Sequence, residues 1–213
     1  MRELTLGELP VIESCLKGQL TKRPFSAKGD RAKEPLGLVH SDVCGPLNVQ
    51  ARGGFEYFVT FIDDYSRYSC LYLMHRKSET FSKFQEFLAM AQNQLGKRLK
   101  ILRSDRGGEY LDMQFQDHLT ELGILSQLTA PGTPQQNGVA ERRNRTLLEM
   151  VRCMLSYSTL PTSFWGHAIE TANDILNVVP SKSVTPWIAK IATLCTYKGA
   201  GLANQVINLK MCH

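Results

Sequence analysis

The feature that most constrains the fold is the run 55–62 (FEYFVTFI), in which aromatic and β-branched side chains dominate. Such a run is typical of a strand buried inside a sheet. The segments 36–43 and 68–74 have a similar character, and the turn-forming residues Asp63 and Asp64 follow the central run. The first part of the chain therefore predicts three consecutive strands that form an antiparallel meander.

A change of hydrophobic period marks the next element. Ser78 is a predicted N-cap and Gly96 a predicted stop signal, which together bound an amphipathic helix. Its apolar face consists of Phe81, Phe84, Leu88, Ala91 and Leu95. A fourth strand at 100–105 leads through a glycine turn and a short helix, which ends at Gly123, to a fifth strand at 124–128. This order predicts an α/β fold with a five-stranded mixed sheet and helices on both faces.

Two more helices are expected after a polar loop rich in turn residues. Asn137 is the predicted N-cap of the first, and prolines at 161 and 180 bracket the second. The predicted inward residues of the first are Leu147, Leu148, Val151, Met154 and Leu155, and those of the second are Trp165, Ile169, Ala172, Ile175 and Leu176.

Charge and cysteine content narrow the class of protein. The net charge of +5 and the pI of about 8.9 mildly favour an anionic partner. No apolar run reaches the roughly 18 residues that a membrane span needs, so no membrane partner is expected. The six cysteines lack the paired spacing of a disulfide scaffold, which favours a reducing compartment, the cytosol or the nucleus.

Three acidic residues stand where strands end or a helix begins. Asp42 is predicted to close the first strand, Asp105 closes the fourth, and Glu141 opens the helix after the fifth. One edge of an open sheet is where ligands bind in such folds. Carboxylates that converge there repel one another unless a cation joins them, and Mg²⁺ accepts carboxylates while keeping positions for water and phosphates. Two such ions, roughly 3.5–4 Å apart, catalyse in-line phosphoryl transfer.

The spacing of these acids is specific, because 35 residues (141 − 105 − 1) separate Asp105 from Glu141. The flanking motifs are HSDVCGP at 40–46, TFIDDYSR at 60–67, LRSDRGGEY at 102–110 and PQQNGVAER at 134–142. With this spacing they resemble the integrase core of copia-type LTR retrotransposons, over about residues 36–180.

This resemblance implies a ribonuclease H-like fold with Asp42, Asp105 and Glu141 as catalytic residues and metal ligands. It implies Mg²⁺ or Mn²⁺ as cofactor, and 3′-end processing and DNA strand transfer as the reactions. The implied partners are the DNA of the element ends and of the target, with a homo-oligomer as the active form. The implied location is the nucleus, with passage through the cytoplasm.

Other polar residues near these motifs have two interpretations each. Asp63 and Asp64 are the nearest rival acids, and we interpret them as turn formers. Glu109 is the predicted supporting acid beside Asp105, whereas His40 and Cys44 are not expected to converge on a metal. The arginines after Glu141 could be a solvated helix face, but beside a phosphate-handling site DNA contact is the better interpretation. The candidate DNA contacts are Gln136, Asn137, Arg142, Arg143 and Arg145.

The ends of the chain depart from the family pattern. Residues 1–35 are expected to be a truncated remnant of a zinc module with a basic linker, 36–184 the catalytic core, and 185–213 a diverged tail. Cys15 fits the zinc module, but Ile12 stands at the partner cysteine position, so no complete zinc site is expected. A non-enzymatic relic that at most binds DNA is therefore the alternative function, and a ribonuclease H-like nuclease is a third.

Overall fold

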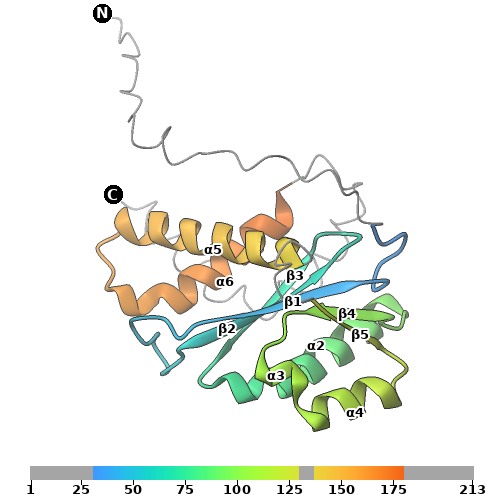
Figure 1. The fold of residues 1–213 in the computed structure, drawn as a ribbon. Coiled ribbons are helices and arrows are strands. Elements are labelled where there is room, and N and C mark those ends of the chain that lie inside the picture. Colours follow the sequence, from blue (N-terminus) through green and yellow to red (C-terminus); the bar gives the residue numbers. More distant parts are fainter. Residues whose placement is uncertain (1–30, 130–136, 180–213) are drawn as a thin grey trace, which may run out of the picture. The chain divides into compact units, whose positions relative to one another are not determined.

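Five strands form one mixed sheet in the computed structural model, which describes residues 31–129 and 137–179 (Figure 1). The described residues belong to one compact unit that begins at Arg31. The order across the sheet is β3-β2-β1-β4-β5; β1 pairs antiparallel with β2, and β2 with β3, while β4 and β5 run parallel to β1. The strands are β1 Val39–Cys44, β2 Tyr57–Asp63, β3 Ser69–Met74, β4 Ile101–Ser104 and β5 Leu125–Leu128.

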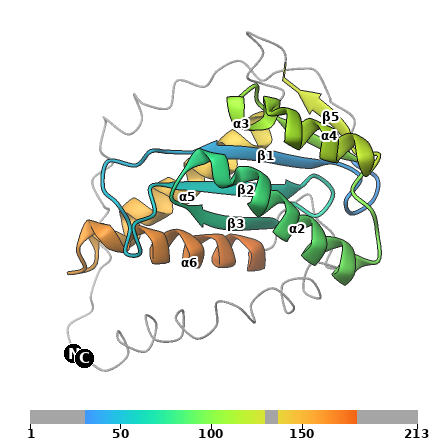
Figure 2. The same cartoon turned by 90° about the horizontal axis from the view of Figure 1, so that it is seen from below.

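Helices cover both faces of this sheet, as the sequence predicted (Figures 1 and 2). On one face lie α2 Thr80–Leu95, α3 Gly108–Leu111 and α4 Met113–Glu121. On the other lie α5 Gly138–Ser156 and α6 Trp165–Val178. Two 3₁₀ turns, η1 Lys77–Glu79 and η3 Thr162–Phe164, precede α2 and α6.

A separate hydrophobic cluster fills each side of the sheet. Phe61 of β2 points to the α2 side, where its ring stacks on Phe87 with the centroids 4.7 Å apart. Phe58 of the same strand belongs to the cluster under α5 and α6, with Leu147 and Trp165. The run 55–62 supplies residues to both clusters because neighbouring side chains of a strand alternate between faces. Strand β2 is therefore buried on both faces, as its composition predicted.

Several local predictions need correction. Ser78 is not the N-cap of α2; it lies inside η1, where the Arg76 amide donates to Glu79 Oε1, and α2 begins at Thr80. The predicted glycine turn after Asp105 is the start of helix α3. Ile175 is 42 % exposed instead of inward. On α6 the buried positions near it are Asn173 and Asn177, because Ser69 at the start of β3 offers them hydrogen-bonding partners.

The C-terminal stop of α2 is as predicted, since Gly96 adopts the left-handed φ of 61° that ends many helices. No helix within residues 31–129 and 137–179 is long and apolar enough to cross a bilayer. The expected zinc-module remnant within 1–35 lies almost entirely outside the described residues, and the expected tail 185–213 lies wholly outside them. Those domain boundaries stay predictions.

Candidate functional site

Asp42 lies on β1, and Asp105 lies directly after the neighbouring parallel strand β4. Asp42 does not close its strand as predicted: β1 continues to Cys44, and Asp42 pairs with Thr60 of β2. The strand continues because the backbone of β2 is available for pairing as far as Phe58. Asp105 follows the last residue of β4 directly. The parallel pairing of β1 with β4 thus brings both carboxylates to the same region of the sheet.

The Asp42 carboxylate interacts electrostatically with the two other predicted acids, Asp105 and Glu141. The pKa of Asp42 is raised from 3.8 to about 7, chiefly by burial and in addition by the charges of Asp105 and Glu141. Glu141 is exposed in the first turn of α5. The structure therefore brings the three predicted carboxylates together as electrostatic neighbours.

A buried amide holds the Asp42 carboxylate in place. Asn144 Nδ2 donates to Asp42 Oδ2 at 3.0 Å, and Thr60 Oγ1 donates to Asn144 Oδ1 at 2.9 Å. Both supporting residues are buried. Neither residue was predicted from the sequence, although Asn144 follows Glu141 by three residues and so lies on the same side of the helix. That spacing was the available signal.

A second polar contact braces the strand beside Asp42. The hydroxyls of Ser41 and Tyr110 share a hydrogen bond of 2.6 Å, and Asn137 Nδ2 donates to the Ser41 carbonyl at 3.1 Å. Asn137 occupies the predicted N-cap position of α5, but its side chain makes no capping bond. Burial raises the pKa of Tyr110 well above its ordinary value, and the nearby charges of Asp42 and Asp105 act in the same direction. Tyr110 is therefore a neutral hydroxyl beside the acids.

The loop after β4 fixes Asp105. The Gly107 amide donates to Asp105 Oδ1 at 3.1 Å, and Arg106 Nε donates to the Thr129 carbonyl at 3.0 Å. A Cβ at Gly107 would lie 2.8 Å from the carboxylate carbon of Glu109, so that side chain packs directly over the glycine. Glu109, the predicted supporting acid, thus lies against the loop that holds Asp105.

The predicted DNA contacts separate into outward and inward residues. Arg142 and Arg145 are exposed on α5. Arg143 turns inward, where Nε and Nη2 donate to Ser69 Oγ at 3.1 and 2.6 Å and Nη2 donates to Asn177 Oδ1 at 2.7 Å. Burial lowers the pKa of Arg143 to about 10. Asn137 faces Ser41, and Gln136 lies outside the described residues.

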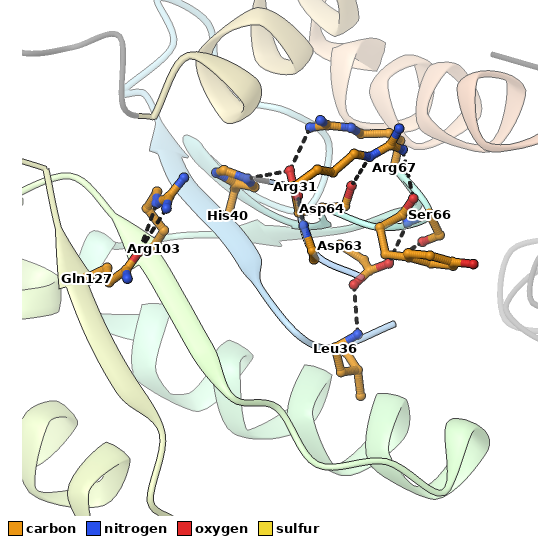
Figure 3. A network of polar contacts seen from close by, with 11 residues as sticks. Arg31, Leu36, His40, Asp63, Asp64, Ser66, Arg67, Arg103 and Gln127 are labelled. Atoms are coloured by element: carbon orange, nitrogen blue, oxygen red, sulfur yellow. Dashed lines mark hydrogen bonds and ion pairs between the residues drawn. The ribbon is translucent and has the colours of Figure 1, made fainter. Parts of the chain in front are cut away.

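Asp64 lies in the turn after β2, as interpreted from the sequence, whereas Asp63 is the last residue of β2. Both anchor a buried polar network (Figure 3). Asp63 Oδ2 accepts hydrogen bonds from the amide and the hydroxyl of Ser66. Asp64 Oδ1 is joined to His40 Nε2 at 3.1 Å and to Arg67 Nη1 at 3.1 Å. Asp63 pairs with Val39, at the opposite end of β1 from Cys44. The His40 imidazole therefore contacts Asp64 and belongs to this polar network.

The donor set fits a hard divalent cation, but no finished coordination shell is formed. Across 31–129 and 137–179, no three His, Cys, Asp or Glu side chains are arranged to hold one metal ion. Asp42 nevertheless has a pKa raised by burial and by two nearby carboxylates. Such an arrangement disfavours ionised Asp42, and a bound cation would relieve this cost. Carboxylate oxygens are the ligands that Mg²⁺ and Mn²⁺ take in proteins.

Comparison with known families and curated proteins gives a consistent result. The family described as the integrase core domain matches residues 32–134. This range includes Asp42 and Asp105 and ends before Glu141. The chain is 47 % identical over 167 residues to the retrovirus-related Pol polyprotein from transposon TNT 1-94 of Nicotiana tabacum. It is 31 % identical over 167 residues to the corresponding polyprotein from transposon RE2 of Arabidopsis thaliana. Each match covers 78 % of this chain but only 13 % and 11 % of the two polyproteins.

Solved structures show the same fold. An intasome of simian T-cell lymphotropic virus in complex with PP2A regulatory subunit B56 gamma matches with a TM-score of 0.58 and 23 % identity, over 74 % of this chain and 55 % of that one. The integrase catalytic core domain of HTLV-2 in complex with magnesium matches with a TM-score of 0.54 and 21 % identity, over 75 % and 99 %. The expected ribonuclease H-like architecture is confirmed by these likenesses.

Proposed function

The chain belongs to the integrase core family of retrotransposon Pol polyproteins, and from this premise we propose that it is a metal-dependent polynucleotidyl transferase. The proposed reactions are water-driven processing of DNA 3′ ends and attack of those 3′ hydroxyls on target DNA. Both are in-line displacements at phosphorus, which need positioning and charge stabilisation but no covalent intermediate on the protein. The chain spans about an eighth of the length of its curated relatives, so its role within a longer protein is part of the proposal.

The observation that carries the proposal is the electrostatic coupling of two carboxylates, those of Asp105 and Glu141, to the half-buried carboxylate of Asp42. Asp42 lies on the central strand, and the charges of Asp105 and Glu141 act on it from the end of β4 and the start of α5. Carboxylates gathered in this way repel one another, and a bound cation would offset that repulsion. The integrase catalytic core domain of HTLV-2 was solved in complex with magnesium, and this supports the proposal that the carboxylates of this chain bind a divalent cation.

In this proposal, Asp42, Asp105 and Glu141 would hold Mg²⁺ or Mn²⁺, which when bound supplies charge stabilisation for the attacking and leaving oxygens. The chain's own residues set the geometry. The Asn144 amide engages one carboxylate oxygen of Asp42, Oδ2. Thr60 fixes the orientation of that amide, and the Gly107 amide fixes Asp105.

DNA is the proposed partner, and its backbone would lie along the exposed side of the first turns of α5. Arg142 and Arg145 are exposed there, next to Glu141, where their guanidinium groups can bind phosphates. Arg143 instead ties α5 to β3 and would act on DNA only through the position of that helix. A homo-oligomer as the active form and a nuclear location, with passage through the cytoplasm, belong to the same proposal.

The test is a strand-transfer and disintegration assay with DNA oligonucleotides, run with Mg²⁺ and with Mn²⁺. We expect turnover that requires the metal and that Glu141→Gln abolishes, while circular dichroism and DNA binding stay unchanged. Glu149→Gln is the matched control, since Glu149 is an exposed acid on the same helix, two turns further on. Equal turnover by Glu141→Gln would contradict the site assignment.

The alternative function, a DNA-binding chain without catalysis, gives a different result in the same assay. The chain would then bind DNA but show no turnover with either metal, and Glu141→Gln would change nothing. Metal-dependent turnover by the 213-residue chain is thus the single observation that separates the two.

A further inference from the structure

Three arginines from separate parts of the chain gather at the turn between β2 and β3. Arg31, which precedes β1, donates from Nε to the Asp64 carbonyl at 3.2 Å and from Nη2 to the Tyr65 carbonyl at 2.8 Å. Arg67, within the turn, contacts Asp64 through Nη1. Figure 3 shows both guanidinium groups on the same side of the turn. Two of the three arginines are thus held in place by the turn itself.

The third member, Arg142, comes from α5. Its neighbour Arg143 bonds to Ser69, two residues after Arg67, which holds the first turn of α5 against the start of β3. Arg142 is close enough that its charge, like that of Arg31, lowers the pKa of Arg67, for which burial is the largest cause. Arg31, Arg67 and Arg142 therefore form one group, here called the arginine cluster.

The carboxylates beneath the arginine cluster are buried and already engaged. Asp63 is 8 % exposed, and its oxygens accept from the Leu36 amide and from Ser66. Asp64 is 4 % exposed and accepts from the Ala32 amide as well as meeting Arg67 and His40. Two carboxylates against three guanidinium groups leave a net charge of +1. The negative charge lies inside, whereas the exposed Arg142 and the one-third-exposed Arg67 side chain face solvent.

The backbone at Arg67 points to a role for its side chain. Arg67 has a φ of 60°, in the left-handed region that glycine and asparagine adopt more easily. A turn that needed only this conformation would be served better by either of those residues. A strained backbone under a functional side chain is a recurrent arrangement at ligand sites.

From these observations we propose that Arg31, Arg67 and Arg142 form a phosphate-binding surface that holds the DNA backbone beside the carboxylate site. The inference rests on the proposed function, because it names the surface that would grip its substrate. Planar guanidinium groups suit phosphodiester oxygens, and such contacts position DNA without reading its sequence. Arg142 directly follows Glu141, so the arginine cluster includes a residue of the helix turn that carries one of the three carboxylates.

The test measures how DNA affinity depends on salt, with the full chain, a fluorescent DNA duplex of random sequence, and EDTA in place of metal. Each phosphate contact contributes about 0.9 to the slope of log K against log salt concentration. We expect Arg67→Gln and Arg142→Gln each to lower that slope by about 0.9 and to weaken binding about tenfold at low salt. Arg98→Gln, an exposed arginine in the loop between α2 and β4, removes the same charge and should leave the slope unchanged.

Folding effects are separated by one further variant, Arg67→Lys, and by the exposed position of Arg142. Arg67→Lys keeps the charge, and we expect it to keep most of the slope even if its melting temperature falls. Arg142→Gln alters an exposed side chain and leaves the Asp64 ion pair intact. The inference is overturned if Arg67→Gln and Arg142→Gln both match Arg98→Gln, or if the wild-type chain binds no duplex.

The binding assay needs no catalysis, so its outcome is distinct from that of the strand-transfer assay. Turnover by the wild type with unchanged slopes in the variants would overturn the arginine cluster and leave the proposed function standing. Reduced slopes without turnover would support the arginine cluster and contradict the proposed enzymatic function.

Discussion

Replacing Asp42 by asparagine should make the metal-free protein more stable above neutral pH. Burial and two nearby acids raise the pKa of Asp42 from 3.8 to about 7. Between about pH 4 and pH 7, Asp42 is protonated in the folded chain and ionised in the unfolded chain. Unfolding therefore releases a proton, and the free energy of unfolding falls as the pH rises. A shift of about three pKa units at 1.36 kcal/mol each corresponds to roughly 4 kcal/mol.

Asp42→Asn mimics the protonated carboxyl and can still accept from Asn144 Nδ2. Near pH 4 the variant and the wild type should therefore have similar stability. At about pH 8 the variant should be more stable by up to about 4 kcal/mol, or roughly 8–16 °C in melting temperature for a chain of this size. Glu170 and Asp174 also have pKa values raised by burial, so only the difference between the two proteins isolates Asp42.

The assay is urea unfolding across this pH range, followed by tryptophan fluorescence, for which the buried Trp165 is a suitable probe. Mg²⁺ should then stabilise the wild type at about pH 8, by about 2.7 kcal/mol at a hundredfold excess over its Kd, and have little effect on Asp42→Asn. Parallel pH dependence of the two proteins would refute the raised pKa. Equal stabilisation of both by Mg²⁺ would refute Asp42 as a ligand.

Three other predictions concern the residues around the site. Asn144→Ala should weaken metal binding or strand transfer about 10–100-fold, because Asp42 loses its amide donor; unchanged metal titration curves would contradict this. The pKa of Asp64 is about 2, because the hydrogen bonds from His40 and the Ala32 amide outweigh the effect of burial. Ionised Asp64 therefore stabilises the folded state above about pH 4, and this contribution is lost as the pH falls towards 2. Asp64→Asn should remove this acid-sensitive part in a pH-dependent melting series, and an unchanged acid transition would contradict it. Phe61→Ala should destabilise the fold by about 3–5 kcal/mol in urea unfolding, because it empties a fully buried position; a loss near 1 kcal/mol would show that the site is not packed as described.

The helices, the strands and their buried faces could be predicted, because they follow from the spacing of hydrophobic residues in the sequence. Phe84, Leu88 and Ala91 are buried on α2 as their spacing indicated, and Leu147 and Val151 are buried on α5. The mixed character of the sheet followed from the same pattern, because each parallel strand is reached through a helix. These outcomes depend on local sequence and on the need to cover a sheet on both faces.

The unpredicted part consists of polar residues that became buried. An amphipathic helix normally turns its polar residues to solvent, so the sequence indicates exposed positions for Asn144, Asn177 and Arg143. Each is buried or half-buried here because a partner on the sheet satisfies it, Asp42 for Asn144 and Ser69 for the other two. Those partners lie 74–108 residues away in the chain, so no local pattern could reveal them.

The hydrogen bonds between α5 and the sheet have a consequence for the order of folding. Asn137 reaches back 96 residues to Ser41, and Asn144 reaches back 102 residues to Asp42. The antiparallel pairs of β1, β2 and β3 are local by comparison and close much shorter loops. A growing chain can therefore build the meander before residue 144 exists. Asp42 receives its supporting amide only when α5 docks, so the carboxylate site takes its final form only after α5 has packed on the sheet.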